Sequence, residues 1–277
     1  MELDIIRFIQ KMASPLADNI FKIITMLGEE FLIIPVIAFV YWCVDKSKGI
    51  YLMQSVVSTL TLGNISKDII KRPRPIGKEG IRSLYTGTAT GYSMPSIHSI
   101  NISSLLTSLN ILKSNLSFII MSIITVLAVG LSRVYLGVHY PSDVLWGILI
   151  GTILPFVLAG IFEYFRNEII ISGAITLIMT GGFLFSPTAD FYKSYGLCVG
   201  LFLGLILEKY FVGFKMPKTR RLKIFRFILG LILSFGINWL LGKYLPIINN
   251  YMYIVKYGII ALFTVGLYPW IFKKINA

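Results

Sequence analysis

The 277-residue chain is 56% hydrophobic and only 14% charged, and apolar runs of about 20 residues recur along its whole length. This pattern is typical of a polytopic membrane protein and excludes a soluble globular domain. The net charge of +13 does not by itself indicate a nucleic-acid partner, because Lys and Arg of membrane proteins gather at helix ends and in cytoplasmic loops. Cys43 and Cys198 both lie in apolar runs, so we interpret them as packing residues.

The first 15 residues predict a short amphipathic helix that lies at the membrane interface. Apolar side chains recur there at helical spacing, with charged side chains opposite them: Leu3, Ile6, Ile9 and Ala13 against Asp4, Arg7 and Lys11.

Nine apolar segments follow, and each is predicted to be a transmembrane helix. Their approximate bounds are 20–44, 50–70, 97–112, 117–136, 142–164, 169–186, 193–212, 225–244 and 252–272. Helices are favoured over the strands of a barrel, because no segment alternates apolar and polar residues. The expected fold is an all-α integral membrane protein, a helical bundle of about nine transmembrane helices in a single membrane domain, 1–277. We expect the core catalytic bundle at about 50–165 and additional transmembrane helices in 166–277.

The connections between these segments differ in charge. With nine spans, the most basic connection, 209–223, shares one side of the membrane with 45–49 and the C-terminal lysines. Its basic residues are Lys209, Lys215, Lys218, Arg220, Arg221 and Lys223. Because such runs are retained in the cytoplasm, we predict a multi-pass protein of the cell membrane with residues 71–96 and 137–141 on the non-cytoplasmic face.

Three short polar clusters interrupt the apolar pattern between residues 67 and 143. Their spacings are Lys67-x6-Arg74-Pro75, Pro95-Ser96-Ile97-His98 and Ser132-Arg133-x5-His139-x3-Asp143. The first two are joined by the loop 76–95, and so long a loop indicates a function. The clusters suit phosphoryl transfer without a metal, because fixed cations can hold a phosphate dianion while one imidazole attacks and the other protonates the leaving oxygen.

The cations and the serine of these clusters are expected at helix ends. Lys67 and Arg74 follow the second span, where a charge near the bilayer indicates function. The neighbouring basic residues are interpreted instead as anchors that reach the interface: Lys71, Arg72, Lys78 and Arg82. Ser96 is expected to cap the third helix, with its hydroxyl and N–H also facing the phosphate.

The only two histidines of the chain, His98 and His139, both fall in the clusters. Asp143 follows His139 by one helical turn, so its carboxylate can accept one ring N–H and leave the other nitrogen free to attack. A zinc site is disfavoured, because two histidines and one carboxylate already used for orientation leave too few ligands.

The clusters resemble the signature of the type 2 phosphatidic acid phosphatase superfamily, which includes lipid phosphate phosphatases, glucose-6-phosphatase and vanadium haloperoxidases. The resemblance covers roughly residues 60–150, and the matching positions are Lys67, Arg74, Pro75, Pro95, Ser96, His98, Ser132, Arg133, His139 and Asp143. The departure is Ile97, where the family usually has glycine. This difference is expected to alter the backbone beside the phosphate and to tighten the leaving-group pocket, but it removes no functional group.

The resemblance implies that His139 is the nucleophile and forms a phosphohistidine, which water hydrolyses. It implies that Asp143 orients His139 and that His98 is the general acid. The phosphate-binding residues that it implies are Lys67, Arg74, Ser96 and Arg133. It requires no metal and no other cofactor.

The leading hypothesis is an integral-membrane phosphatase that acts on a lipid phosphate, whether phosphatidate-like, polyprenyl diphosphate-like or a sphingoid phosphate. The alternative enzyme is a phosphatase or phosphotransferase acting on a soluble phosphate ester such as a sugar phosphate. A transporter or anion channel is a third hypothesis. It would be supported by two repeated halves with a broken helix in each, and the sequence shows no such pattern. The expected partners are a lipid phosphate and membrane lipids, not nucleic acid.

Overall fold

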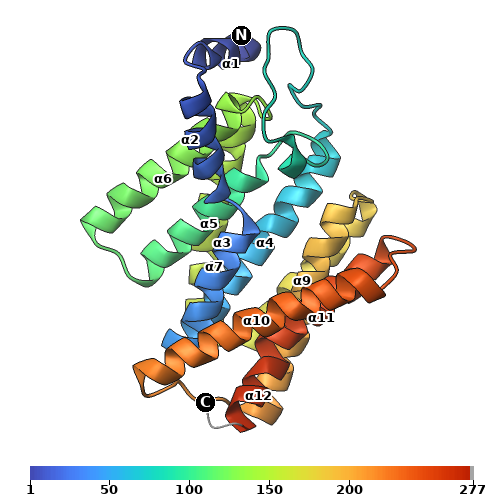
Figure 1. The fold of residues 1–277 in the computed structure, drawn as a ribbon. Helices are drawn as coiled ribbons and strands as arrows, with labels where there is room; N and C mark the ends of the chain where they lie inside the picture. Colours follow the sequence, from blue (N-terminus) through green and yellow to red (C-terminus); the bar gives the residue numbers. More distant parts are fainter. Residues whose placement is uncertain (275–277) are drawn as a thin grey trace. The chain divides into compact units, whose positions relative to one another are not determined.

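In the computed structural model, which describes residues 1–274, every element is a helix. Figure 1 shows their course. The longer elements are α1 (Glu2–Gln10), α2 (Pro15–Met26), α3 (Glu30–Phe39), α4 (Lys46–Ile70), α5 (Ile97–Leu112), α6 (Leu116–Tyr135), α7 (Pro141–Phe165), α8 (Glu168–Thr180), α9 (Ala189–Leu207), α10 (Arg220–Tyr244), α11 (Tyr251–Leu262) and α12 (Tyr268–Lys274). Short helical turns are η1 (Val40–Val44), η2 (Thr86–Thr88), η3 (Gly181–Leu184), η4 (Glu208–Val212) and η5 (Phe263–Leu267).

The all-α prediction is confirmed, and six helical stretches among the described residues are long and apolar enough to cross a membrane. They are Pro15–Val44, Leu116–Tyr135, Pro141–Phe165, Ala189–Val212, Arg220–Tyr244 and Tyr251–Lys274. The predicted spans 50–70, 97–112 and 169–186 are also helical, but they lie outside this set. The two elements α5 and Glu168–Leu184 are short, and α4 carries many polar side chains. Six candidate spans are therefore found, and the count of nine stays a prediction.

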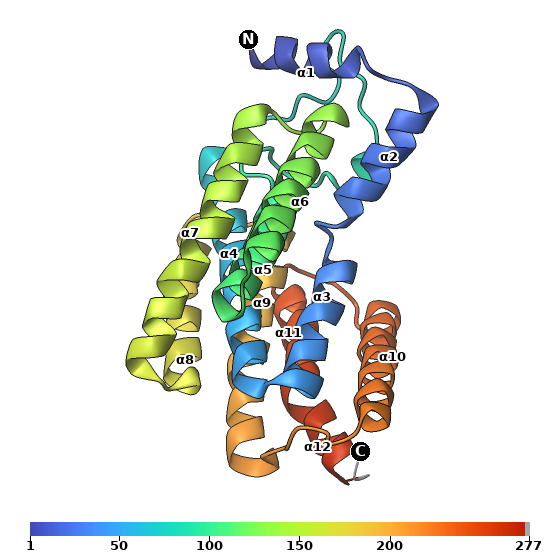
Figure 2. The ribbon, with the colours of Figure 1, turned by 90° about the vertical axis from the view of Figure 1, so that its left-hand side faces the viewer.

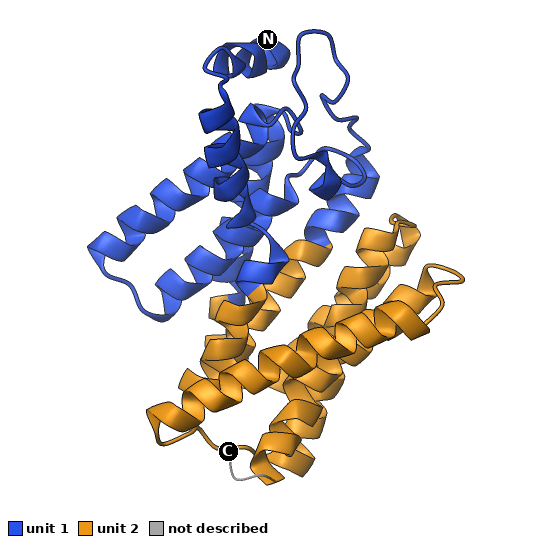
Figure 3. Cartoon of the chain, viewed as in Figure 1, with its two compact units in different colours: residues 1–33, 62–158 blue, residues 34–61, 159–277 orange. Residues whose placement is uncertain are grey.

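The chain divides into two compact units, coloured separately in Figure 3. Unit 1 contains residues 1–33 and 62–158, and unit 2 contains residues 34–61 and 159–277. All three sequence clusters belong to unit 1, so each unit is described by itself and unit 1 in more depth.

Close packing of α7 on α5 fixes one side of unit 1. A Cβ on Gly147 would lie 2.7 Å from the carbonyl oxygen of Ser96, and a Cβ on Gly151 would lie 2.6 Å from that of Ile100. Small residues four apart let two helix backbones approach this closely. The start of α5, which carries Ser96 and His98, is thereby held against the first turns of α7.

The amphipathic helix predicted at the N-terminus is present as α1, and Figure 2 shows it at the same end of unit 1 as the loop after α4. Its apolar face packs on protein: Ile6 is fully buried in a cluster with Val134, Tyr140 and Val144. A second apolar stripe remains exposed, formed by Met1, Ile5, Phe8 and Met12. The helix is therefore part of the fold of unit 1, and its location at a membrane interface stays a prediction.

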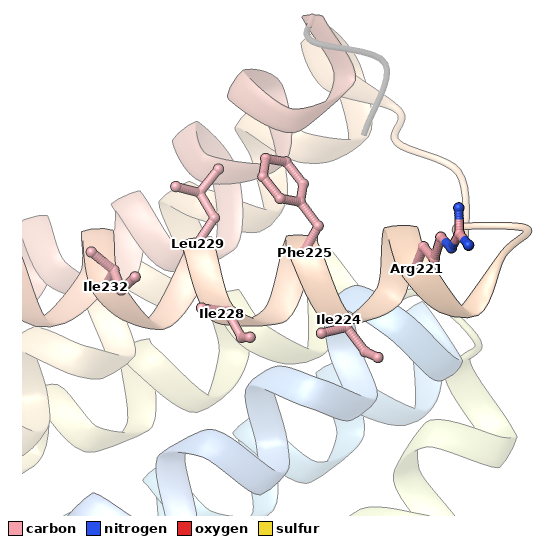
Figure 4. Close-up of a pocket in the computed structure, with 6 residues that line it drawn as sticks. All are labelled: Arg221, Ile224, Phe225, Ile228, Leu229 and Ile232. Atoms are coloured by element: carbon pink, nitrogen blue, oxygen red, sulfur yellow. The ribbon is translucent and has the colours of Figure 1, made fainter.

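Unit 2 is held by a glycine ridge and by an ion pair between a half-buried lysine and a buried carboxylate. A Cβ on Gly200 of α9 would lie 2.1 Å from the carbonyl oxygen of Gly258 on α11, so these helices touch through their backbones. Lys46 lies 2.8 Å from the buried carboxylate of Glu208. A hollow along α10 is lined by side chains of this helix alone, and Arg221 is its only ionisable member (Figure 4). With one cation and an otherwise apolar lining, this hollow offers no group for acid–base chemistry.

Candidate active site

The loop at residues 138–140, between α6 and α7, presents His139 as a buried side chain with only 1% exposed area. Gly137 precedes it with a φ of +67°, a left-handed conformation that glycine adopts without steric cost. This turn ends α6, and α7 begins two residues after His139, at Pro141. The sequence thus places the imidazole at a tight helix–helix corner with little freedom.

Arg74 defines which ring nitrogen of His139 carries the lone pair. Its Nη1 lies 3.0 Å from His139 Nε2 and also donates to the carbonyl of Val138 at 3.0 Å. Because a guanidinium can only donate, Nε2 must accept, and the ring hydrogen is on Nδ1. The other nitrogens of Arg74 donate to the carbonyls of Gly91 and Thr90 at 3.0 and 2.6 Å, so the loop 76–95 orients this arginine.

Asp143 faces the other nitrogen of the ring, as predicted. Its Oδ2 lies 3.5 Å from His139 Nδ1 and accepts hydrogen bonds from the Ser93 hydroxyl and from the Tyr140 N–H at 2.8 Å. The carboxylate is fully buried, so these donors replace the water that it has lost. The order Asp143, His139 Nδ1–H and an Nε2 that accepts from Arg74 suits an imidazole that is oriented for nucleophilic attack once Arg74 is drawn to another acceptor.

The electrostatic surroundings keep this imidazole neutral. Burial lowers the pKa of His139 well below its usual value, and the positive charges of Arg133, Arg74 and Lys67 lower it further. A neutral ring retains its lone pair at physiological pH, which nucleophilic attack requires. These three cations therefore lie near enough to act on one imidazole.

Arg133 and Lys67 are buried cations with 0% and 6% exposed area. Arg133 donates from Nη1 to the Thr25 hydroxyl at 3.0 Å, while its Nε and Nη2 have no hydrogen-bond partner within residues 1–274. A buried guanidinium N–H group without a hydrogen bond is costly, and a bound anion would accept these hydrogen bonds.

The start of α5 supplies Ser96 and His98. Ser96 caps this helix, because its hydroxyl accepts from the N–H of Ser99 at 3.4 Å, as the sequence predicts. Its own N–H donates to the carbonyl of Asp143 at 3.0 Å, so this group is engaged by α7 instead of facing a phosphate. Ile97, the departure from the family pattern, packs beside Gly63 of α4: its Cδ1 would lie 3.1 Å from a Cβ added there.

His98 lies beside a second carboxylate that the sequence did not reveal. Its Nε2 is buried, has no hydrogen-bond partner within the described chain, and lies 3.8 Å from Glu29 Oε1. The Tyr85 hydroxyl donates to the same Glu29 oxygen at 2.9 Å. Burial is the main cause that raises the pKa of Tyr85, and its hydrogen bond to Glu29 adds to it, so this hydroxyl keeps its proton.

Among residues 1–274 no group of three or more His, Cys, Asp or Glu side chains is arranged to hold a metal ion. All seven site residues predicted from the sequence lie in one unit: Lys67, Arg74, Ser96, His98, Arg133, His139 and Asp143. Direct contacts join Arg74 to His139 and His139 to Asp143. In comparison with known proteins, residues 48–167 match the model of the PAP2 superfamily. Residues 192–277 match that of the PAP2 superfamily phosphatase, transmembrane extension.

The chain belongs to the PAP2 superfamily. This confirms the family resemblance of the three clusters, all of which lie within 48–167. With its six candidate spans and the transmembrane extension, this PAP2 protein is a multi-pass integral membrane protein.

Two relatives and one solved structure illustrate the similarity. The undecaprenyl-diphosphatase of Sulfolobus acidocaldarius is 36% identical over 130 residues, which are 47% of this chain and 63% of the relative. Sphingosine-1-phosphate phosphatase 2 of Mus musculus is 31% identical over 143 residues, which are 49% of this chain and 40% of the relative. The crystal structure of Aquifex aeolicus LpxE superimposes with a TM-score of 0.51 at 25% identity, covering 57% of this chain and 94% of LpxE. The PAP2 chain thus spans roughly half the length of these two relatives.

Proposed function

We propose that this PAP2 protein is a membrane phosphatase that hydrolyses a lipid phosphate through a phosphohistidine on His139. The observation that carries the proposal is the position of His139 between Asp143, 3.5 Å from its Nδ1, and Arg74, 3.0 Å from its Nε2, with the unpartnered N–H groups of Arg133 buried in the same unit. Both relatives described above are named for a lipid phosphate or diphosphate, which supports a lipid as the leaving group.

In the proposed first step, Nε2 of His139 attacks phosphorus, forming a P–N bond while the P–O bond to the lipid breaks. His98 gives its proton to the departing oxygen, so that the lipid leaves as a neutral alcohol or, from a diphosphate, as a monophosphate. The phosphate oxygens accept the N–H groups of Arg74 and Arg133, which frees Nε2 from Arg74. Lys67 and the Ser96 hydroxyl complete the proposed phosphate site.

In the second step, water attacks phosphorus and the P–N bond breaks. His98, now unprotonated, takes the proton of this water, which follows from microscopic reversibility. Inorganic phosphate leaves, and both histidines return to their starting state. Asp143 accepts the Nδ1–H of His139 throughout and stabilises the positive charge of the phosphorylated ring.

The experiment that tests the function is a substrate panel in detergent or vesicles, with released phosphate measured for each compound. The panel contains phosphatidate, phosphatidylglycerol phosphate, a polyprenyl diphosphate, sphingosine phosphate and a sugar phosphate. Turnover of one or more lipids at rates well above the sugar phosphate supports the proposal. Preference for the sugar phosphate would favour the soluble-ester alternative, and turnover of none would contradict a phosphatase.

Activity is expected to survive exhaustive chelation, and orthovanadate is expected to inhibit. The proposed phosphate ligands are side-chain cations fixed in the fold, so neutralising the phosphate needs no added ion. Released phosphate is measured before and after dialysis against EDTA, and over a vanadate titration. Loss of activity with EDTA that a divalent ion restores would contradict this mechanism.

We further propose a single membrane domain with nine spans, α4, α5 and α8 with η3 being the three additional ones. The dense positive charge of 209–223 then lies in the cytoplasm, and the catalytic residues lie on the opposite, non-cytoplasmic face. Cysteines at Lys78 and Lys218, both exposed, test this in a background that lacks Cys43 and Cys198. In intact cells an impermeant maleimide is expected to label position 78 and not position 218. The reverse labelling would overturn the sidedness and leave the chemistry intact.

A further inference from the structure

Arg72 binds the Asp143 carboxylate directly, although the sequence analysis interprets it as a helix-end anchor. Its Nη1 donates to Asp143 Oδ1 at 2.8 Å and to the Ser142 hydroxyl at 2.6 Å. Its guanidinium also lies 3.9 Å from the centre of the Tyr140 ring, so an aromatic face limits its motion. These contacts use the Asp143 oxygen that His139 does not face.

Glu2, in the first turn of α1, holds the other end of this arginine. Its carboxylate forms an ion pair with Nη2 of Arg72 and accepts the N–H and the hydroxyl of Ser142 at 3.0 and 2.7 Å. One oxygen of Glu2 therefore binds the first turn of α7, and the other binds the arginine that reaches the next residue, Asp143. The result is a closed ring of charged and polar groups around the N-terminus of α7.

Glu2 and Arg72 are both ionised at neutral pH. Burial opposes the charge of Glu2, but its hydrogen bonds with Ser142 and Arg72 outweigh burial and lower its pKa. Burial likewise opposes the charge of Arg72, but Glu2 and Asp143 outweigh it and raise its pKa. A fully buried carboxylate such as Asp143 needs such a cation, because an unpaired buried charge is very costly.

The rest of α1 keeps Glu2 in place. Gln10, at the other end of this helix, donates to the carbonyls of Arg82 and Tyr135, both at 2.7 Å, and accepts the Arg82 N–H at 3.0 Å. Together with buried Ile6, these bonds fix the middle and the C-terminal end of α1 on unit 1. The position of Glu2 is thus set by a docked helix and not by a loose terminus.

We propose that Arg72 and Glu2 are positioning residues of the reaction: Arg72 fixes the rotamer of Asp143 that faces His139, and Glu2 fixes Arg72. This inference rests on the proposed function of His139 and deepens it, since it makes α1 a part of the active site. Neither residue binds the phosphate, so both act on the rate of the chemical step.

Kinetics of Arg72→Gln, Arg72→Lys, Glu2→Gln and Asp4→Asn test the proposal on the best lipid of the panel. Arg72→Gln is expected to lower kcat by about 10- to 100-fold with KM within about threefold, because a charge-assisted hydrogen bond of this kind is lost. Glu2→Gln should lower kcat less, and Arg72→Lys should recover part of the loss. Asp4→Asn removes one exposed charge from the same helix and should leave kcat unchanged. A raised KM at constant kcat would instead make Arg72 a substrate ligand and overturn the proposal.

A further measurement separates positioning from general destabilisation. The double variant Arg72→Gln/Asp143→Asn should lose no more rate than Asp143→Asn alone, because Arg72 acts through Asp143. Additive losses would contradict the proposal.

A readout that needs no turnover distinguishes failure of this inference from failure of the proposed function. Since the chain has only two histidines, selective ¹⁵N labelling gives a spectrum in which His98→Gln assigns the signals of His139. Arg72→Gln and Glu2→Gln should shift the His139 ring signals, and Asp4→Asn should not. Shifted signals in a chain that hydrolyses no phosphate would refute the function and keep the positioning roles. Unshifted signals in folded variants would refute the positioning roles whatever the activity.

Discussion

Replacing His139 with alanine is expected to abolish turnover, with a loss of kcat of roughly 10⁴-fold or more, because the attacking atom itself is removed. The fold should tolerate the change, since the loop around His139 is also held by Gly137 and by the hydrogen bond from Arg74 to Val138. Phosphate released from the best lipid substrate measures the loss. A substrate labelled with ³²P measures the intermediate, which should form in the parent protein as an acid-labile, alkali-stable adduct.

The matched control is Lys78→Ala, which removes an exposed basic side chain from the 76–95 loop without touching the cluster around His139. This control should retain both turnover and the labelled adduct. Binding of vanadate to His139→Ala should survive in part, because Arg74, Arg133 and Lys67 remain. Normal turnover in His139→Ala, or a labelled adduct of unchanged yield, would remove this histidine from the mechanism.

The contact between His139 and Asp143 was predictable because both residues lie within one helical turn of a recognisable helix start. Local spacing fixes such a pair before any tertiary structure is known. The two other clusters could be assigned to the same site because the chain contains only two histidines and few charges inside apolar surroundings. Site residues of types that are rare in the rest of the chain can thus be recognised from a single sequence.

The support around Asp143 could not be predicted in the same way. Ser93 is one of several small polar residues in a loop, and Glu2 lies 140 residues from the Ser142 that it binds. Arg72 sits in a run of basic residues where charge alone does not tell a catalytic neighbour from an anchor. Glu29, beside His98, lies between α2 and α3, in a stretch that reads as one span. Such contacts depend on how the helices pack, so no local sequence pattern predicts them.

Packing between helices also explains why fewer candidate spans are found than the nine predicted. Polar residues of α5 are buried within the protein, among them Ser99, Ser103 and Ser104. A helix that is covered by neighbours does not need the apolar surface that lipid requires, so its composition no longer marks a span. Hydropathy therefore selects the apolar helices and leaves open the role of α4 and α5, which carry the proposed site residues Lys67 and His98.

Replacing His98 with alanine is expected to slow hydrolysis in proportion to how poor the leaving group is. A general acid contributes about 10²- to 10⁴-fold when an alkoxide would otherwise leave, and little when the leaving oxygen is already stable as an anion. The test compares a lipid alkyl phosphate with a p-nitrophenyl phosphate in the parent protein and in His98→Ala. In kcat/KM, which reports the phosphorylation of His139 and not the later attack of water, the alkyl ester should lose about 10²-fold or more and the p-nitrophenyl ester about tenfold or less.

Asp143→Asn supplies the matched comparison. Glu29 lies 3.8 Å from His98 Nε2 and accepts a hydrogen bond from the Tyr85 hydroxyl, whereas a different carboxylate, Asp143, lies 3.5 Å from the proposed nucleophile His139. Asp143→Asn should therefore slow both esters, because it weakens the attack that they share, whereas His98→Ala should separate them. The labelled phosphohistidine should still form from the p-nitrophenyl ester in His98→Ala, since its formation needs only the attacking ring and a competent leaving group. Equal losses of kcat/KM for the two esters in His98→Ala would show that His98 positions the phosphate and does not donate the proton to the leaving oxygen.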